Sequence, residues 1–426
     1  MNFNPEIFRA YDIRGIYGRD FDDEFAFRLG SALVHYLKRR KFLVAHDDRS
    51  FSPSLAESFI RGVTSMGGDV EFLGLSTTPL FNFTFGLLGV DGGAIIAASH
   101  NPIKYGGFKI FGEAGRILGL STGLEQVKNM MEDHPESSRY GGRVNSLDKS
   151  EILNKYVDFI LKRAKMKSGP AMKVRVEPPI IAQEELNQLF EKLGIANSPA
   201  DYNVKFAFDA DEDRISVFDR DDKPIHSDYI TAILMQDMLL FWSKPKVVYD
   251  LRFSKGVVER FKEWGIRHFR SRVGRSFIKD EATLRRADIS GELSGHIFFK
   301  EASYNELPLL AMLRILKIMN RTGKNIDELA QPFRTWENSG EINMEIQNSE
   351  VKSQNDNSKF NFFGMLKEKY KDGKINELDG ITVEYNDWWF NVRASNTEPL
   401  IRLVVEAKTK DLLDEKVAEI KKGMDL

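Results

Sequence analysis

The segment from residue 93 to residue 109 reads Gly-Ala-Ile-Ile-Ala-Ala-Ser-His-Asn-Pro-Ile-Lys-Tyr-Gly-Gly-Phe-Lys. Its apolar first half predicts a buried strand, which ends at a hydroxyl group, Ser99, and is followed by a polar loop. In open α/β sheets, ligands bind at the loops that follow the strands. Ser99 is therefore a candidate nucleophile at the edge of a sheet. A plain turn is the alternative for this segment taken alone.

A serine hydrolase is the obvious rival interpretation of Ser99. The chain has no Gly-x-Ser-x-Gly motif around this serine, which such a nucleophile usually needs. His100 is adjacent to Ser99, so on an extended chain we expect the two side chains to point apart. Pro102 keeps this loop extended, because the residue before a proline avoids the helical region.

The sequence around this segment alternates helical and strand patterns. Helices are expected over 26–40 and 53–66, with Ser52 as an N-cap, and strands over 42–45, 70–73 and 94–98. Such alternation predicts a mostly parallel sheet that is covered on both faces. The fold class is therefore α/β.

The chain of 426 residues is too long for a single core, so several domains are expected. We predict four: an α/β domain at 1–145, a short α/β domain at 146–242, a third α/β domain at 243–336 and an α+β domain at 337–426. Residues 348–358 are rich in Asn and Ser and predict a mobile loop.

Composition excludes several classes of protein. The net charge of −2 argues against nucleic acid or an anionic membrane as the main partner. The absence of cysteine excludes thiol catalysis, disulfides and zinc–thiolate sites. The first residues do not resemble a secretory signal and no apolar stretch is long enough for a bilayer, so we expect a cytoplasmic protein.

Three aspartates alternate along the segment Asp209-Ala-Asp-Glu-Asp-Arg, which follows an apolar run at 204–208. Carboxylates crowded on one loop repel each other unless a cation neutralises them. Their oxygen atoms suit Mg²⁺, which keeps open positions for phosphate oxygens. An EF-hand would need glycine and glutamate where Arg214 and Arg220 stand, so that type of calcium loop is excluded.

Two further loops carry hydrogen-bonding groups, and for each alone a surface turn is an equal alternative. Glycines flank the first loop, whose polar side chains suit the adjacent hydroxyls of a polyol: Glu292, Ser294 and His296. The second lies between two predicted strands and suits a tetrahedral anion: Arg393, Ser395, Asn396 and Thr397. No Gly-Lys-Ser/Thr loop is present, so nucleotide binding is not indicated.

Taken together and in this order, the motifs resemble those of the α-D-phosphohexomutases, the superfamily of phosphoglucomutase, phosphomannomutase and phosphoglucosamine mutase. The matching segments span nearly the whole chain: Phe8-Arg-Ala-Tyr-Asp-Ile-Arg14-Gly15, Ala98–Pro102, Asp209–Arg214, Gly291–His296 and Arg393–Pro399. The first of them is most similar to the phosphomannomutase/phosphoglucomutase branch. The resemblance implies four domains around a central cleft, three of them α/β and the last α+β.

The resemblance also implies a reaction and a set of site residues. A phosphorylated Ser99 would exchange its phosphoryl group with hexose 1- and 6-phosphates of mannose or glucose through a 1,6-bisphosphate. Mg²⁺ would be the metal, and glucose 1,6-bisphosphate or mannose 1,6-bisphosphate the activator. The implied catalytic residues are Ser99, His100, Arg14 and Lys109, and the implied metal ligands are Asp209, Asp211, Asp213 and Ser99. The implied substrate-binding residues are Arg214, Arg275, Glu292, Ser294, His296, Arg393, Ser395, Asn396 and Thr397.

Several residues depart from the family pattern. Ala210 stands where the metal loop usually has glycine, which would strain the loop if it needs a positive φ there. Glu212 adds a carboxylate, Arg275 replaces a frequent histidine, and the second domain is short. A silent phosphosugar-binding relative that acts as a sensor or subunit is therefore the alternative function. Phosphoglucosamine mutase and a plain phosphatase are lesser ones, and the chain is expected to be a monomer or homodimer.

Overall fold

The computed structural model describes residues 3–9, 11–99, 101–131, 141–166, 173–345, 357–395 and 400–422. The chain divides into two compact units. Unit 1 comprises Met1–Pro224 and Asn305–Gly323, and unit 2 comprises Ile225–Tyr304 and Lys324–Leu426.

The first sheet of unit 1 has the order β1-β5-β4-β2-β3-β6. Its strands are β1 (Ile13–Ile16), β5 (Tyr105–Phe111), β4 (Gly92–Ile96), β2 (Lys41–His46), β3 (Asp69–Leu75) and β6 (Val144–Ser146). Strand β2 is parallel to β3 and β4, whereas β5 is antiparallel to β4 and β1. The sheet is therefore mixed, and its parallel part brings the carboxyl ends of β2 and β4 to one edge.

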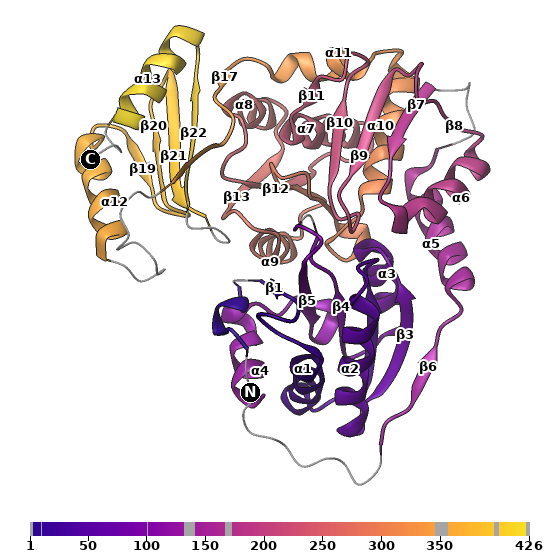
Figure 1. Ribbon diagram of the computed structural model, residues 1–426. Coiled ribbons are helices and arrows are strands. Elements are labelled where there is room, and N and C mark those ends of the chain that lie inside the picture. The colour runs from indigo at the N-terminus through magenta and orange to yellow at the C-terminus, as the bar shows by residue number, and fades with distance from the viewer. Residues whose placement is uncertain are drawn as a thin grey trace. The chain divides into compact units, whose positions relative to one another are not determined.

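Helices α1 (Asp23–Leu37) and α2 (Ser52–Ser65) pack against each other beside this sheet, and α4 (Leu124–Met130) packs against α1 (Figure 1). The prediction of Ser52 as an N-cap is wrong. The helix begins at Ser52, and the N-cap, Phe51, makes no side-chain cap. The Ser52 hydroxyl instead donates to Asp47 Oδ1 at 2.5 Å, at the end of β2.

A second sheet in unit 1 places β10, β9, β7 and β8 side by side in that order. Their bounds are β7 (Lys173–Glu177), β8 (Ala196–Asn197), β9 (Val204–Phe208) and β10 (Ile215–Phe218). The accompanying helices are α3 (Thr78–Leu88), α5 (Lys149–Ala164), α6 (Gln183–Leu193) and α10 (Pro308–Thr322). Helix α5 packs against α3, α6 and α10, although α10 comes more than a hundred residues later in the chain.

Unit 2 contains a mixed sheet with β13 (Arg267–Ser271), β12 (Lys246–Asp250), β14 (Ile289–Gly291) and β15 (Ile297–Phe299) in that order. Strand β12 is parallel to both of its neighbours, and β15 is antiparallel to β14. The helices of this part are α7 (Ser227–Met238), α8 (Lys255–Glu263), α9 (Arg275–Arg285) and α11 (Ile326–Ala330).

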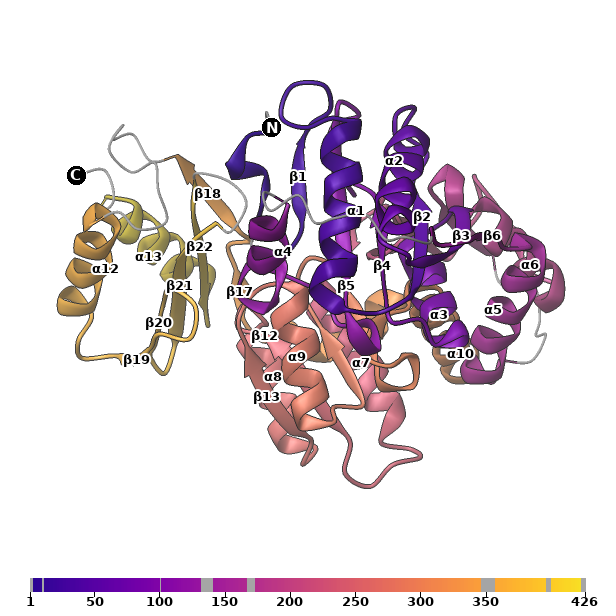
Figure 2. The same ribbon diagram turned by 90° about the horizontal axis from the view of Figure 1, so that it is seen from below.

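The C-terminal part of unit 2 is an antiparallel sheet with two helices on one face (Figures 1 and 2). Its elements are β17 (Glu337–Asn338), β18 (Ile342–Glu345), α12 (Asn357–Lys369), β19 (Lys374–Asn376), β20 (Ile381–Glu384), β21 (Trp388–Ala394), β22 (Leu400–Ala407) and α13 (Lys410–Lys422). Alternate apolar residues of β20, β21 and β22 form one core with Leu366, Leu413 and Ile420 of the helices.

The fold class, α/β with mixed sheets and a C-terminal α+β part, is confirmed. The domain boundaries at 145, 242 and 336 stay predictions. Most of the loop predicted at 348–358 lies outside the described residues. No helix in the described ranges is both long and apolar enough to cross a membrane.

Candidate active site

Ser99 lies three residues beyond the end of β4, with its backbone in the left-handed region at φ 48°. A residue other than glycine rarely adopts this conformation, and strained residues of this kind cluster at functional sites. The side chain is 1% exposed, and its hydroxyl donates to Asp209 Oδ2 at 3.0 Å. The predicted nucleophile and the predicted metal loop therefore meet. His100, the next residue, lies outside the described residues.

Asp47 and Arg49 hold the Ser99 loop in place, and the sequence reasoning missed both. Arg49 Nη2 donates to the carbonyl oxygens of Ser99 and Asn101, each at 2.9 Å. Asp47 forms an ion pair with Arg49 and accepts a hydrogen bond from the Ala98 amide at 3.3 Å. The sequence does contain a signal for these two residues, because they come directly after the predicted strand that forms β2. This strand is parallel to β4 and ends at the same edge of the sheet, where ligands bind.

The three aspartates of the metal loop follow β9 and form a compact group. Their carboxylate oxygens, one from each of Asp209, Asp211 and Asp213, lie within 4.8 Å of one another. Asp211 and Asp213 are buried, each 1% exposed. Within the described ranges, Asp211 Oδ1 has no hydrogen-bond partner. A buried carboxylate oxygen with no partner, next to two more carboxylates, fits an oxygen-ligated divalent cation such as Mg²⁺.

Lys109 reaches this loop from β5 and is 2% exposed. Its Nζ forms ion pairs with Asp211 and, at 2.7 Å, with Asp213, and it donates to Thr78 Oγ1 at 3.1 Å. The Thr78 hydroxyl in turn donates to Asp211 Oδ2 at 2.9 Å. Burial and the Asp213 carboxylate oppose ionisation of Asp211, but Lys109 and Thr78 outweigh them and lower its pKa. Lys109 is therefore a buried cation that keeps Asp211 ionised.

Of the two arginines predicted in this part, Arg14 contacts the Ser99 loop and Arg214 ends the metal loop. Arg14, on β1, donates to the Ala98 carbonyl at 3.0 Å and pairs with Asp12 at 2.7 Å. Burial alone would lower the pKa of Arg14, but Asp12 and, after it, Asp211 and Asp213 raise it. Arg214 Nε lies 3.7 Å from Asp209 Oδ2, and its backbone amide donates to Asp209 Oδ1 at 3.1 Å.

The strain expected at Ala210 is instead found at Glu212. Among the described residues, Glu212 has a left-handed backbone at φ 61°, and Ala210 does not. The Glu212 side chain is fully buried, and burial together with the nearby Glu185 raises its pKa well above the usual range. Burial likewise raises the pKa of Glu185 to about 7. Glu212 of this loop therefore forms a buried carboxyl pair with Glu185 of α6.

In unit 2, the predicted sugar loop is a tight turn between β14 and β15. His296 Nδ1 lies 2.8 Å from Glu292 Oε2 and 2.9 Å from Ser294 Oγ, so one ring orients both side chains. Gly295 has φ 98°, which an L-residue rarely adopts. Glu292 is buried, whereas Ser294 is exposed. An exposed hydroxyl next to a fixed carboxylate can form hydrogen bonds with the hydroxyl groups of a sugar.

The predicted phosphate clamp begins at the end of β21. Arg393 is 2% exposed, and its Nη2 donates to Glu341 Oε2 at 3.0 Å. The Ser395 amide donates to the Leu400 carbonyl at 2.8 Å. Asn396 and Thr397 lie outside the described residues. Arg275 is the first residue of α9 and follows Gly274, whose φ is 130°.

Comparison with known proteins gives the family. Residues 5–136 match the model of phosphoglucomutase/phosphomannomutase alpha/beta/alpha domain I, residues 226–335 match domain III, and residues 341–423 match the C-terminal domain. A phosphomannomutase of Methanocaldococcus jannaschii is 36% identical, over 97% of this chain and 96% of that protein. The chain belongs to the phosphoglucomutase/phosphomannomutase family. It is a phosphohexomutase, an intramolecular phosphotransferase.

Solved structures agree with this family fold. A crystal structure of a phosphoglucomutase/phosphomannomutase family protein from Burkholderia thailandensis has a TM-score of 0.84 at 24% identity, covering 99% of this chain and 98% of that one. An N-acetylphosphoglucosamine mutase of Aspergillus fumigatus, in complex with glucose 1,6-bisphosphate, has a TM-score of 0.61 at 11% identity. It covers 99% of this chain and 96% of that one.

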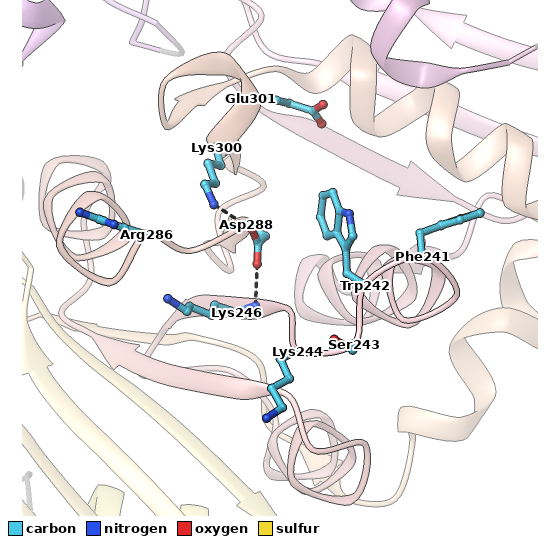
Figure 3. Close-up of a pocket in the computed structure, with 9 residues that line it drawn as sticks. All are labelled: Phe241, Trp242, Ser243, Lys244, Lys246, Arg286, Asp288, Lys300 and Glu301. Atoms are coloured by element: carbon cyan, nitrogen blue, oxygen red, sulfur yellow. Dashed lines mark hydrogen bonds and ion pairs between the residues drawn. The ribbon is translucent and has the colours of Figure 1, made fainter.

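A pocket of about 780 Å³ in unit 2 of the mutase lies away from the predicted sugar loop of the same unit (Figure 3). Its lining includes Trp242, Lys246 and Asp288, and Asp288 Oδ2 accepts a hydrogen bond from the Lys246 amide at 2.9 Å. Lys246 is the first residue of β12, whereas Asp250, at the other end of that strand, contacts the sugar loop through the Leu293 amide at 2.8 Å. The pocket and the sugar loop are therefore at opposite ends of the sheet.

The carboxyl pair of the mutase makes a testable contribution to stability. The pKa of Glu185 is about 7 in the folded protein, against 4.5 for a glutamate exposed to water. The stability that the neutral carboxyl group contributes is therefore complete below pH 4.5 and is lost as the pH rises through about 7. We expect Glu185→Gln to gain about 3 kcal/mol relative to wild type between pH 4.5 and pH 8.

Urea denaturation at pH 5 and pH 8 measures this effect. Glu184→Gln is the control, because Glu184 is the preceding residue and its side chain is 53% exposed. Parallel pH profiles for wild type and Glu185→Gln would contradict the assignment.

Proposed function

We propose that this mutase interconverts the 1- and 6-phosphates of mannose and glucose through a phosphoserine at Ser99 and a hexose 1,6-bisphosphate. The observation that carries the proposal is the strained, buried Ser99, whose hydroxyl lies 3.0 Å from Asp209 in the carboxylate group. The name of the 36% identical relative, phosphomannomutase, supports mannose phosphate as a substrate. The bisphosphate complex of the A. fumigatus enzyme supports the intermediate.

In the first transfer, the bond between phosphorus and Ser99 Oγ breaks and a bond from phosphorus to the free sugar hydroxyl forms. The proton of the sugar hydroxyl would pass to Ser99 Oγ, the leaving oxygen, by way of the group formed by Lys109, Asp211 and Asp213, where Nζ is hydrogen-bonded to both carboxylates. Ser99 would then be a neutral hydroxyl again. Arg14 and Arg214 would offset the negative charge of the phosphoryl group. In the second transfer, the phosphoryl group at the other position of the sugar returns to Ser99.

Asp209, Asp211, Asp213 and the phosphorylated Ser99 would hold Mg²⁺, which supplies positive charge near the transferring phosphoryl group when bound. The predicted sugar loop and phosphate clamp would bind the sugar and its second phosphate. Glu292 and Ser294, both positioned by His296, would bind sugar hydroxyls. The phosphate that does not react would bind the predicted clamp of Arg393, Ser395, Asn396 and Thr397, with Arg275 as a further cation.

The test is ³¹P NMR of the purified protein with Mg²⁺, a trace of glucose 1,6-bisphosphate, and either glucose 1-phosphate or mannose 1-phosphate. We expect the resonance of the 6-phosphate to appear in both reactions. Release of inorganic phosphate without the 6-phosphate would indicate a phosphatase. No conversion of either sugar would contradict the proposal and favour a phosphosugar-binding relative without activity.

A further inference from the structure

Glu341 is a single carboxylate that three arginines of unit 2 share. Arg252 Nη1 donates to its Oε2 at 2.7 Å, and Arg393 Nη2 donates to the same oxygen at 3.0 Å. Arg402 Nη1 donates to Oε1 at 2.8 Å. The residue lies between β17 and β18, far in sequence from Arg252 and from the clamp, and no motif marks it.

The arginines around Glu341 are largely withdrawn from water. Arg252 is 4% exposed and Arg393 is 2% exposed, while the side chains of Glu341 and Arg402 are 20% and 21% exposed. Burial and, after it, the positive charge of the neighbouring Arg252 lower the pKa of Arg393. Burial opposes ionisation of Glu341, but Arg252 and Arg393 outweigh it and lower its pKa. Glu341 is therefore an anion whose negative charge offsets the positive charges of the guanidinium groups around it.

Arg252 also connects Glu341 to the sugar loop. Its Nε and Nη2 donate to the two oxygens of Asp250 at 3.1 and 2.7 Å, and Asp250 accepts from the Leu293 amide in that loop. Arg393 Nε, in contrast, has no hydrogen-bond partner within the described ranges. Arg393 thus retains a buried donor for a further anion while one side of its guanidinium group is already bound to Glu341.

We propose that Glu341 is a positioning residue that competes with the substrate phosphate for these guanidinium groups and so limits the affinity of the clamp. The inference rests on the proposed function, since it takes Arg393 as a phosphate ligand. A sugar bisphosphate that must be released and turned around between two transfers needs a clamp that holds either phosphate only moderately. Three arginines without a resident carboxylate would bind a phosphate dianion much more tightly.

The test measures binding of inorganic phosphate by isothermal titration calorimetry to the full chain treated with EDTA. We expect Glu341→Gln to lower the Kd at least about tenfold, because one negative charge near the bound anion is removed. In turnover, both KM and kcat for the hexose phosphate should fall, because the ligand leaves more slowly. A merely structural defect would weaken phosphate binding and raise KM. Glu341→Asp withdraws the carboxylate by one methylene and should lower the Kd by a smaller factor.

Glu384→Gln is the matched control. The Glu384 side chain is also 20% exposed and pairs with one arginine of the same unit, Arg270, at 2.6 Å. Its phosphate affinity should equal that of wild type. An unchanged or higher Kd in Glu341→Gln overturns the inference. If the glutamine variant does not fold, an unchanged or higher Kd in Glu341→Asp overturns it instead.

Arg393→Gln establishes where the phosphate binds. It should abolish phosphate binding, and an unchanged Kd in this variant also overturns the inference. Phosphate binding requires no turnover, so failure of the inference is distinguishable from failure of the mutase reaction in the NMR experiment.

Discussion

Ser99→Ala is expected to lower kcat for hexose phosphate interconversion by at least about 10⁴-fold, because it removes the proposed carrier of the phosphoryl group. The other predicted ligands would remain, so binding of the hexose phosphate should change little. Glucose 1,6-bisphosphate labelled with ³²P should phosphorylate wild type and not the variant. Phosphopeptide mapping should place the label on the peptide that contains residue 99.

The control for Ser99→Ala is the same substitution at another serine with a left-handed backbone. Ser303 has φ 55°, close to the 48° of Ser99, and lies outside the predicted site. Ser303→Ala therefore carries the same backbone cost without loss of a phosphoryl acceptor. If Ser99→Ala retained more than about a hundredth of the wild-type kcat, a different phosphoryl carrier would be required.

Lys109→Met is expected to destabilise the protein by about 3–5 kcal/mol, since it leaves two buried carboxylates without their cation. Lys109 is 2% exposed and contacts both Asp211 and Asp213. Mg²⁺ should recover part of this loss, because a dication at the aspartates replaces the missing charge. Urea denaturation with Mg²⁺ and with EDTA measures both effects.

Lys173→Met is the matched control for Lys109→Met. Lys173 pairs with Asp201 at the surface, where the two side chains are 57% and 71% exposed, so its loss should cost less than about 1 kcal/mol. A loss below about 1 kcal/mol in Lys109→Met, or the same loss with and without Mg²⁺, would contradict the role of Lys109 as the cation of the metal loop.

Local patterns predicted many elements of the fold correctly. The strands predicted at 42–45, 70–73 and 94–98 are found as β2, β3 and β4 with ends that differ by one or two residues, because a short apolar run next to a polar loop identifies a buried strand. The Ser52 N-cap prediction failed because the helix begins at Ser52 itself, where the hydroxyl is hydrogen-bonded to Asp47, and a pattern confined to one helix contains no information about that contact.

The candidate site was predictable where its chemistry lies in one loop. Ser99 and Asp209 occur in such loops, and the folded chain brings them into hydrogen-bond contact. Arg49 and Glu341 act through contacts with residues fifty or more positions away, which only the folded chain brings together. Backbone strain was expected at Ala210 but is found at Glu212, because the geometry of the turn determines which of its residues has a positive φ.

The position of α10 in the chain has a consequence for synthesis on the ribosome. This helix belongs to unit 1, where Arg314 and Lys317 donate to the carbonyls of Arg163 and Ala164 at the end of α5, yet it is made after residues 225–304. The face of α5 that packs against α10 therefore stays exposed during synthesis until residue 323 has left the exit tunnel. A fragment ending at residue 224 would never receive this helix, so unit 1 cannot be produced as a contiguous N-terminal piece.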